Sequence, residues 1–181
     1  EGVQREPKHG QSVVTTLDIR LQEIAHESLI KAMESNKARL GCAILLESRT
    51  GKVRAMVNLV RNQKGAAYGE WNQVAYGYPV EPGSVFKPIT MAAALDMNVI
   101  KPDDYFYDSG SVEAGCKKPI QNADNRSYKD QNMSGILERS INTGVVFIAN
   151  KLGKENFRQY VEKFGFGTKT GIELDTENPG T

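Results

Sequence analysis

The chain has few of the residues that build metal centres and disulfide frameworks. Among its 181 residues there are two cysteines and two histidines. Cys42 and Cys116 are too few and too far apart in sequence for a zinc site or a disulfide framework. His9 and His26 have no second ligand at metal-binding spacing. We therefore expect neither a metal nor a cofactor, and we predict that Cys42, which lies in an apolar run, is a buried free thiol.

The chain also lacks an excess of one charge and a long apolar segment. Its 23 basic and 22 acidic residues give a formal net charge of +1, so its charge does not favour binding to nucleic acid. No run approaches the roughly 20 apolar residues that span a bilayer, and residues 1–5 do not resemble the start of a signal peptide. We expect a piece of a longer protein that forms one domain of ordinary size.

The first half of the chain predicts a linker, a helix and a β-hairpin. Residues 1–12 are polar and indicate a linker or arm, and the β-branched run 13–16 predicts a short strand. Thr16 or Asp18 can cap a helix that ends at about Asn36. Its apolar residues at helical spacing are Leu21, Ile24, Ala25, Leu29 and Met33.

Two apolar segments, 41–47 and 53–59, predict strands joined by a tight turn in which Gly51 supplies a positive φ. Residues 60–80 have no hydrophobic period and indicate a long surface connection. Beyond it the sequence predicts helices at about 84–97, 134–139, 144–152 and 155–163, with a mostly irregular excursion at 101–133. Ser134 is the predicted cap of the short second helix, and Gly153 and Gly165 end the last two. The predicted inward residues include Ile89, Ala92, Ala93, Leu95, Val145, Val146, Ile148, Ala149, Leu152, Phe157, Tyr160 and Val161.

A serine precedes a lysine by three residues at the start of the 84–97 helix. Residues three apart on a helix share a face, so Lys87 can act as the base that takes the proton of a Ser84 nucleophile. Pro88 has no backbone N–H, and this places Ser84 at the helix entrance rather than deep in the helix. Burial and the positive end of the helix dipole both favour the neutral amine that a base requires.

A lone S-x-x-K motif occurs by chance in many chains. A second pair, Ser140 and Asn142, lies at a break between two predicted helices, where a hydroxyl and an amide could transfer a proton and bind a peptide. By itself, the simpler interpretation of that pair is a helix cap and its neighbour.

Taken together and in order, these segments resemble the transpeptidase domain of class B penicillin-binding proteins from about residue 12 to the end of the chain. The resemblance lies in Thr15-Thr16-Leu17-Asp18, Thr50-Gly51, Glu81-Pro82-Gly83-Ser84-Val85-Phe86-Lys87-Pro88, Ser140-Ile141-Asn142-Thr143-Gly144, Phe164-Gly165-Phe166-Gly167 and Thr170-Gly171-Ile172. It implies an α+β fold of the penicillin-binding and β-lactamase type, with an antiparallel sheet and a helical subdomain. Glu81 before Pro82 resembles the division-specific branch.

The resemblance also implies an activity and its residues. Ser84 would be acylated by the D-Ala-D-Ala end of a peptidoglycan stem peptide, Lys87 would be the base, Ser140 would relay a proton and Asn142 would hold the substrate amide. β-Lactam antibiotics would acylate Ser84 as substrate mimics. The implied location is the periplasmic side of the inner membrane, among membrane proteins of the division apparatus, with the anchor outside this chain.

One triplet, Lys169-Thr170-Gly171, spells the family's third motif. In the family that motif lies on a strand well after the Phe-Gly-Phe-Gly segment, whereas here it lies inside the segment, so we interpret Lys169 as a solvated loop residue. Residues 13–181 are then the N-terminal portion of the domain, and the C-terminal strands with the genuine motif are absent. Exposed sheet edges would favour self-association.

Two other functions remain open at this point. The chain could be a non-catalytic module that senses penicillin or binds stem peptides. It could also be a β-lactamase, which would hydrolyse the antibiotic steadily instead of keeping a long-lived adduct.

Overall fold

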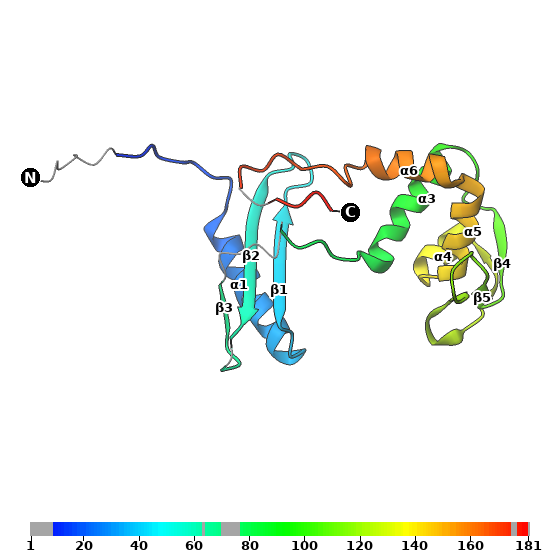
Figure 1. Ribbon diagram of the computed structural model, residues 1–181, viewed down its shortest axis with the longest axis horizontal. Helices are drawn as coiled ribbons and strands as arrows, with labels where there is room; N and C mark the ends of the chain where they lie inside the picture. Colours follow the sequence, from blue (N-terminus) through cyan, green and yellow to red (C-terminus); the bar gives the residue numbers. More distant parts are fainter. Residues whose placement is uncertain (1–8, 63, 70–76, 175–176, 181) are drawn as a thin grey trace, which may run out of the picture. The chain divides into compact units, whose positions relative to one another are not determined.

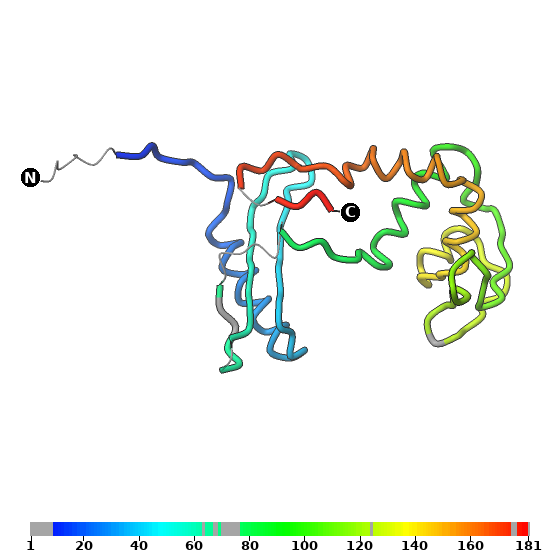
Figure 2. The backbone as a smooth tube through the Cα atoms, viewed as in Figure 1, coloured from blue at the N-terminus to red at the C-terminus, as the bar shows by residue number. Residues whose placement is uncertain are grey.

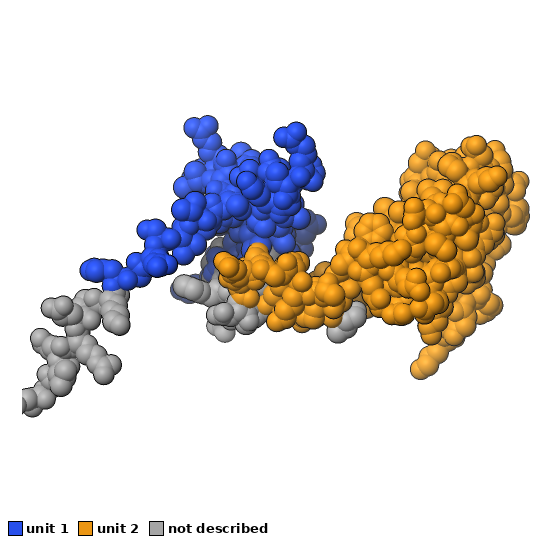
Figure 3. Space-filling view, turned by 90° about the horizontal axis from the view of Figure 1, so that it is seen from above, with its two compact units in different colours: residues 1–78 blue, residues 79–181 orange. Residues whose placement is uncertain are grey.

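The computed structural model describes residues 9–62, 64–69, 77–174 and 177–180 (Figure 1). The chain divides into two compact units, residues 1–78 and residues 79–181, which Figure 3 colours blue and orange. Each unit has its own core. None of the helices in the described ranges combines the length and the hydrophobicity needed to cross a bilayer.

Unit 1 is a helix packed on a small antiparallel sheet, and Figure 1 shows α1 beside the two long strands. The sheet has the order β1-β2-β3, and its hairpin pairs Leu40 with Val60 and Ala43 with Val57. Gly51 has φ +70° in the hairpin turn, as predicted. The elements of this unit are α1 (Ile19–Ser35), β1 (Leu40–Leu46), β2 (Val53–Arg61) and β3 (Ala67–Gly69).

The helix α1 is confirmed, and of its two candidate caps Asp18 is the one used. The Asp18 carboxylate accepts hydrogen bonds from the backbone N–H groups of Arg20 (2.9 Å) and Leu21 (3.1 Å), which satisfies donors that lack a partner in the first turn. The strand predicted at 13–16 is wrong. This exposed segment contacts β2 only through isolated bonds, such as Thr16 Oγ1 to the Val53 carbonyl (2.7 Å).

The helix covers one face of the sheet. Ala55, Val57 and Leu59 are buried there against Ala25 and Met33 of α1. The opposite face of β1 is exposed and apolar, and it consists of Leu40, Cys42, Ile44 and Leu46. Two predictions are therefore wrong. Cys42 is exposed, because strand alternation turns it away from α1, and Ile24 lies off the buried stripe, with 62% of its surface exposed.

Unit 2 is a helical bundle with two short ladders beside it, and its chain path runs from green to red in Figure 2. The predicted helices are confirmed. The region 101–133 was predicted to be mostly irregular, which is wrong in part, because β4 pairs with β7 and β5 with β6. The elements are η1 (Gly83–Phe86), α3 (Lys87–Asp96), β4 (Tyr105–Asp108), β5 (Ser111–Val112), β6 (Ile120–Gln121), η2 (Ala123–Asn125), β7 (Lys129–Asn132), α4 (Met133–Glu138), α5 (Asn142–Leu152) and α6 (Lys154–Lys163).

The ends of these helices correct one prediction and confirm two. The cap of α4 is Asn132, whose side chain accepts from Gly135 N at 2.8 Å, and not Ser134. Gly153 (φ +80°) and Gly165 (φ +88°) follow α5 and α6 in the left-handed conformation that glycine adopts without strain. The helix boundaries therefore follow local chemistry closely.

The core of unit 2 joins α3, α4 and α5. Ala92 was predicted to pack inward but is exposed. The two residues before it in α3, Thr90 and Met91, are buried. Both the helices and the antiparallel ladders of the predicted α+β class are present. The buried members of the main cluster are Met91, Ala94, Ile100, Met133, Ile136, Ile141 and Ile148.

Candidate active site

Ser84 lies at the entrance of α3, within the 3-10 turn Gly83–Phe86. Gly83 enters that turn with φ +60°, a conformation that most side chains resist. Pro88 stands in the first turn of α3, where its missing N–H leaves no helical hydrogen bond unmade. Ser84 is exposed, and no hydrogen bond of its hydroxyl is found within the described part of the chain.

Lys87 is the centre of the polar contacts in this region. Its Nζ donates to the Ser140 carbonyl oxygen (2.5 Å), to Ser140 Oγ (2.9 Å) and to Asn142 Oδ1 (2.7 Å). Three donors and three acceptors match, which is the bonding pattern of an ammonium group. Three of the four predicted site residues are thus in direct contact.

Burial of Lys87 acts against that charge and favours the neutral amine, whereas the three acceptors favour the charged one. Burial of the amine lowers the pKa of Lys87 from its ordinary value of 10.5, because a charged group loses hydration when it leaves water. A neutral amine has two N–H groups and one lone pair. The lone pair can accept a proton from a serine hydroxyl, so Lys87 can serve as a base.

The corner between α4 and α5 presents Ser140 and Asn142. Ser140 has φ +55°, and the bonds from Ile141 N to the Ile136 carbonyl (2.9 Å) and from Ser140 N to the Leu137 carbonyl (3.1 Å) form a Schellman motif. Ile136 and Ile141 are both fully buried, so the apolar contact typical of this motif fixes the corner. A serine occupies the position where glycine is usual.

The amide of Asn142 is held in one orientation. Its Oδ1 accepts from Lys87, and its Nδ2 donates to the Gln121 carbonyl oxygen at 2.7 Å. Rotation of the amide by 180° would turn its nitrogen toward the lysine N–H groups and its oxygen toward a carbonyl, so both bonds would be lost. One N–H of the amide remains available for a ligand.

A cavity of about 410 Å³ adjoins these groups. Ser84, Lys87, Thr90 and Asn142 are its polar lining residues, and the remaining wall is largely apolar. Phe86 contacts Phe157 and Phe166 with ring centroids 6.3 Å and 5.0 Å away, which ties the turn that carries Ser84 to α6 and to the segment after it. The other lining residues are Gly83, Ile120, Val145, Val146 and Ala149.

Lys169 lies outside this arrangement. The segment around Lys169 is exposed and forms no strand, and the neighbouring N–H groups of Thr170 (2.6 Å) and Gly171 (3.3 Å) donate to the Glu177 carboxylate. This agrees with the interpretation of Lys169 as a loop residue. Within the described ranges, no group of three or more His, Cys, Asp or Glu residues is placed to hold a metal ion.

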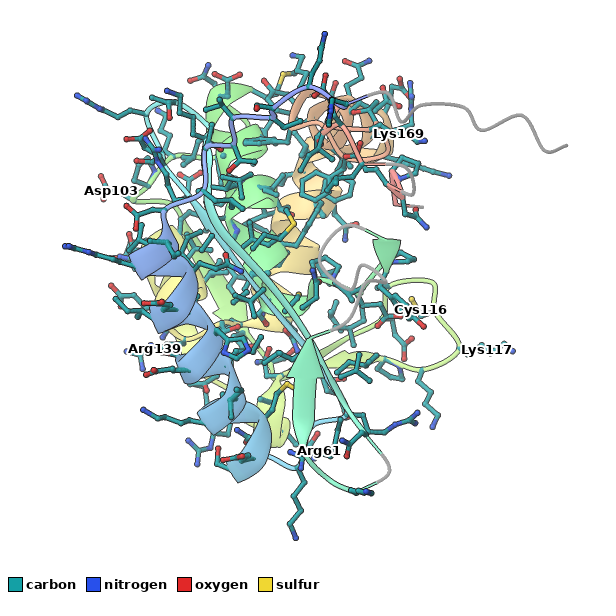
Figure 4. All side chains as sticks on the ribbon, turned by 90° about the vertical axis from the view of Figure 1, so that its left-hand side faces the viewer. Arg61, Asp103, Cys116, Lys117, Arg139 and Lys169 are labelled. Carbon is teal, nitrogen blue, oxygen red and sulfur yellow. The ribbon has the colours of Figure 1, made fainter. Side chains whose placement is uncertain are left out.

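Sequence reasoning missed four residues that support the corner, namely Asp108, Gln121, Asn122 and Thr143. Three of them lie in the region predicted to be irregular, where single polar residues give no periodic signal. The long connection between β5 and β6 is exposed, and the side chain of Lys117 points outward from it (Figure 4). Gln121, at the end of β6, bonds Asn142, and Asp108 and Asn122 bond Thr143.

Comparison with known proteins gives consistent matches. The family model described as the penicillin binding protein transpeptidase domain matches residues 41–181. A peptidoglycan D,D-transpeptidase FtsI homolog of Chlorokybus atmophyticus is 31% identical over 180 residues, covering 93% of this chain and 26% of the relative. A probable peptidoglycan D,D-transpeptidase PenA of Neisseria flavescens is 31% identical, covering 96% of this chain and 44% of the relative.

Solved structures show the same fold. The crystal structure of penicillin binding protein 3 from Mycobacterium tuberculosis matches 98% of this chain and 41% of that chain, with 26% identity and a TM-score of 0.83. The chain thus spans less than half the length of these relatives. The mixed helical and antiparallel fold and the class B resemblance predicted from the sequence are confirmed. The chain belongs to the penicillin-binding protein transpeptidase domain family.

Proposed function

We propose that this chain carries the nucleophile of a peptidoglycan D,D-transpeptidase, with Ser84 as nucleophile, Lys87 as base, Ser140 as proton relay and Asn142 as a substrate-binding residue. The observation that carries the proposal is the set of bonds from Lys87 Nζ to Ser140 and Asn142, one helical turn from Ser84. The relatives named as peptidoglycan D,D-transpeptidases support it.

The first half of the reaction transfers an acyl group to the enzyme. Ser84 Oγ attacks the carbonyl carbon of the penultimate D-alanine, and its proton passes to neutral Lys87 as the O–C bond forms. The C–N bond of the tetrahedral intermediate then breaks. Of the three acceptors around Lys87, only Ser140 Oγ can both accept and donate, so it can deliver the proton to the departing amine of D-alanine.

The second half forms the cross-link. An amine of a neighbouring stem peptide attacks the ester carbonyl of Ser84, a new C–N bond forms, and the Ser84 oxygen leaves and regains a proton. The free N–H of the Asn142 amide binds a carbonyl oxygen of the substrate. A β-lactam follows the first half only, because its ring amide opens without a departing fragment. A solved structure of a similar protein, penicillin binding protein 3, is a complex with aztreonam.

We further infer that residues 13–181 are the N-terminal portion of the transpeptidase domain, preceded by a linker at 1–12. The match to FtsI and PenA proteins supports a division-specific role. The corresponding location is the extracytoplasmic side of the inner membrane, among division-apparatus membrane proteins. The exposed apolar face of β1 supports self-association of the chain.

Intact-mass measurement after incubation with a labelled penicillin tests the proposal. We expect one adduct per chain, absent in Ser84→Ala and retained in the control Ser109→Ala, which removes an exposed hydroxyl bonded to the Ser111 carbonyl. Reversible binding without an adduct would favour a sensor module. Steady hydrolysis of the antibiotic would favour a β-lactamase. An adduct only on a longer form of the protein would show that this portion alone is insufficient.

A further inference from the structure

A carboxylate lies fully buried beside the corner that carries Ser140 and Asn142. Asp108, the last residue of β4, has 0% of its surface exposed. Among the described residues no lysine, arginine or histidine pairs with it. A buried charge without a counter-ion is costly unless dipoles replace its hydration.

Four hydrogen bonds do replace that hydration. Oδ1 of Asp108 accepts from Thr143 Oγ1 (2.6 Å) and Gly110 N (2.8 Å), and Oδ2 accepts from Asn122 Nδ2 (2.8 Å) and Tyr128 N (2.7 Å). Burial raises the pKa of Asp108, but the four hydrogen bonds together lower it by more, so the net pKa lies below the usual range of an aspartate. The group is therefore an anion at neutral pH.

Two of these partners connect the carboxylate to the site. Asn122 Oδ1 accepts from Thr143 N at 3.2 Å, and the neighbouring Gln121 carbonyl accepts from Asn142 Nδ2 at 2.7 Å. Two consecutive residues at the end of β6 therefore hold two consecutive residues in the first turn of α5. The anion also lies near the N-terminus of α5, where negative charge is favourable.

The opposite side of the corner is fixed by packing. The Schellman bonds and the buried Ile136 and Ile141 hold the backbone before Asn142, and Asp108 with Asn122 holds the backbone after it. Ser140, in its left-handed conformation, lies just before Ile141. A shift of either support would move Asn142 Oδ1 and Ser140 Oγ relative to Lys87.

We infer that Asp108 is a positioning residue of the acyl-transfer site, and that through Thr143 and Asn122 it holds Asn142 and Ser140 at bonding distance from Lys87. This inference rests on the proposed function for its catalytic consequence. The hydrogen bonds that join Asp108, Asn122 and Thr143 do not depend on the proposed function.

Two variants separate positioning from folding. Thr143→Val keeps the shape of the side chain and removes the hydroxyl bonded to Asp108, whereas Thr143→Ser keeps the hydroxyl. Asp108→Asn is the second variant. Each carboxylate oxygen of Asp108 accepts from one backbone N–H, so the NH₂ group of the asparagine must face one of these donors in place of an oxygen. Ser109→Ala is the matched control, because Ser109 directly follows Asp108 and its hydroxyl donates to the Ser111 carbonyl. Each is compared at a temperature where circular dichroism shows it folded.

The first readout is the ¹⁵N relaxation of the Asn142 side-chain amide, which requires no activity. We expect its order parameter to fall toward values below about 0.6 in Thr143→Val and in Asp108→Asn, and to stay at the wild-type value in Ser109→Ala. Thr143→Ser should restore most of the wild-type order. An unchanged order parameter in both folded variants would overturn the inference.

The second readout is the rate of acylation by the labelled penicillin per folded molecule. We expect a loss on the order of 10²-fold in the acylation rate constant, with little change in the dissociation constant of the initial complex. A purely structural role would lower only the folded fraction. If wild type forms no adduct, the proposed activity of this chain fails, and the Asn142 order parameter still decides the positioning inference.

Discussion

Units 1 and 2 bury their apolar residues in different ways. Unit 1 buries one face of its sheet under α1 and leaves the other face of β1 apolar and exposed, with Ile44 at 41% and Leu46 at 61%. Unit 2 surrounds its core with helices from several sides and buries a polar network beside it. All four predicted site residues belong to unit 2. The contacts from Lys87 to Ser140 and Asn142 therefore lie within unit 2.

The comparison also explains where polar groups are tolerated. In the described residues, no buried side-chain nitrogen or oxygen lacks a hydrogen-bond partner. In unit 2 this is achieved by linking Asp108, Asn122 and Thr143 to one another, so that satisfying the buried polar groups also fixes the corner of the site. Among the described residues of unit 1, the buried side chains are apolar, so no such network is required there.

The largest effect is expected at Lys87. Lys87→Met keeps a chain of similar length but removes the proposed base, so acylation by a labelled penicillin should slow by about 10²- to 10⁴-fold. Lys52→Met, in the exposed hairpin turn of unit 1, is the control and should acylate like wild type. Equal rates in the two variants would show that the chemistry does not depend on Lys87.

The same residue predicts a pH dependence of stability. Burial lowers the pKa of Lys87 in the folded chain, so between that value and 10.5 the unfolded chain binds more protons. The free energy of unfolding should therefore rise with pH across this window. Urea titrations of wild type and Lys87→Met at several pH values measure this: the difference between their free energies of unfolding should change with pH inside the window and stay constant above 10.5. A parallel pH dependence in the variant would contradict the assignment.

A matched pair of glycines compares the two cores directly. A Cβ on Gly144 would lie 2.7 Å from Cγ1 of the fully buried Ile136, whereas a Cβ on Gly41 would lie 2.8 Å from the Sδ atom of Met33. Thioether ends adjust readily and branched buried side chains do not. We expect Gly144→Ala to lose about 1–2 kcal/mol, after the helix propensity gained by alanine. Gly41→Ala should change stability by less than about 1 kcal/mol.

Urea unfolding followed by circular dichroism measures both variants. Gly144→Ala should also slow acylation, because Gly144 follows Asn142 by two residues in α5. If Gly41→Ala proved the more damaging change, the core of unit 1 would be the more tightly packed of the two, and the comparison between the units would be reversed.

The smallest effect on stability is expected on the outer face of β1. Ile44→Lys adds charge to an exposed position, so the free energy of unfolding should stay within about 0.5 kcal/mol of wild type. Self-association measured by sedimentation should decrease. Val57→Lys on the buried face is the contrasting variant and should unfold unit 1. A strongly destabilised Ile44→Lys chain would mean that this face is covered.

Local signals predicted most of the fold. The turn at Gly51 and the stops at Gly153 and Gly165 each follow from the chemistry of one residue, and the structure places them as expected. The cap of α1 is Asp18, one of the two predicted candidates.

Apart from the α4 cap, which is Asn132 and not Ser134, the errors occurred where tertiary contacts decide. Cys42 lies in an apolar strand, but its burial depends on which face of the sheet a helix covers. The residues of the strand do not indicate which face that is.

The candidate site was predictable only in part. Ser84 and Lys87 are three residues apart, so helix geometry alone predicts that they lie one turn apart on the same face. Ser140 and Asn142 lie far along the chain, and only the resemblance to a family linked them to Lys87. Asp108 and Asn122 had no signal at all, because a buried polar residue is identified by partners that are distant in sequence.

The left-handed backbone at Ser140 has an evolutionary consequence. This conformation costs a serine about 1–2 kcal/mol that a glycine avoids, while a glycine offers Lys87 no hydroxyl. Stability and chemistry therefore select different residues at one position. If Ser140 is the proton relay proposed above, a homologous chain with glycine at this position should have lost that step of the reaction.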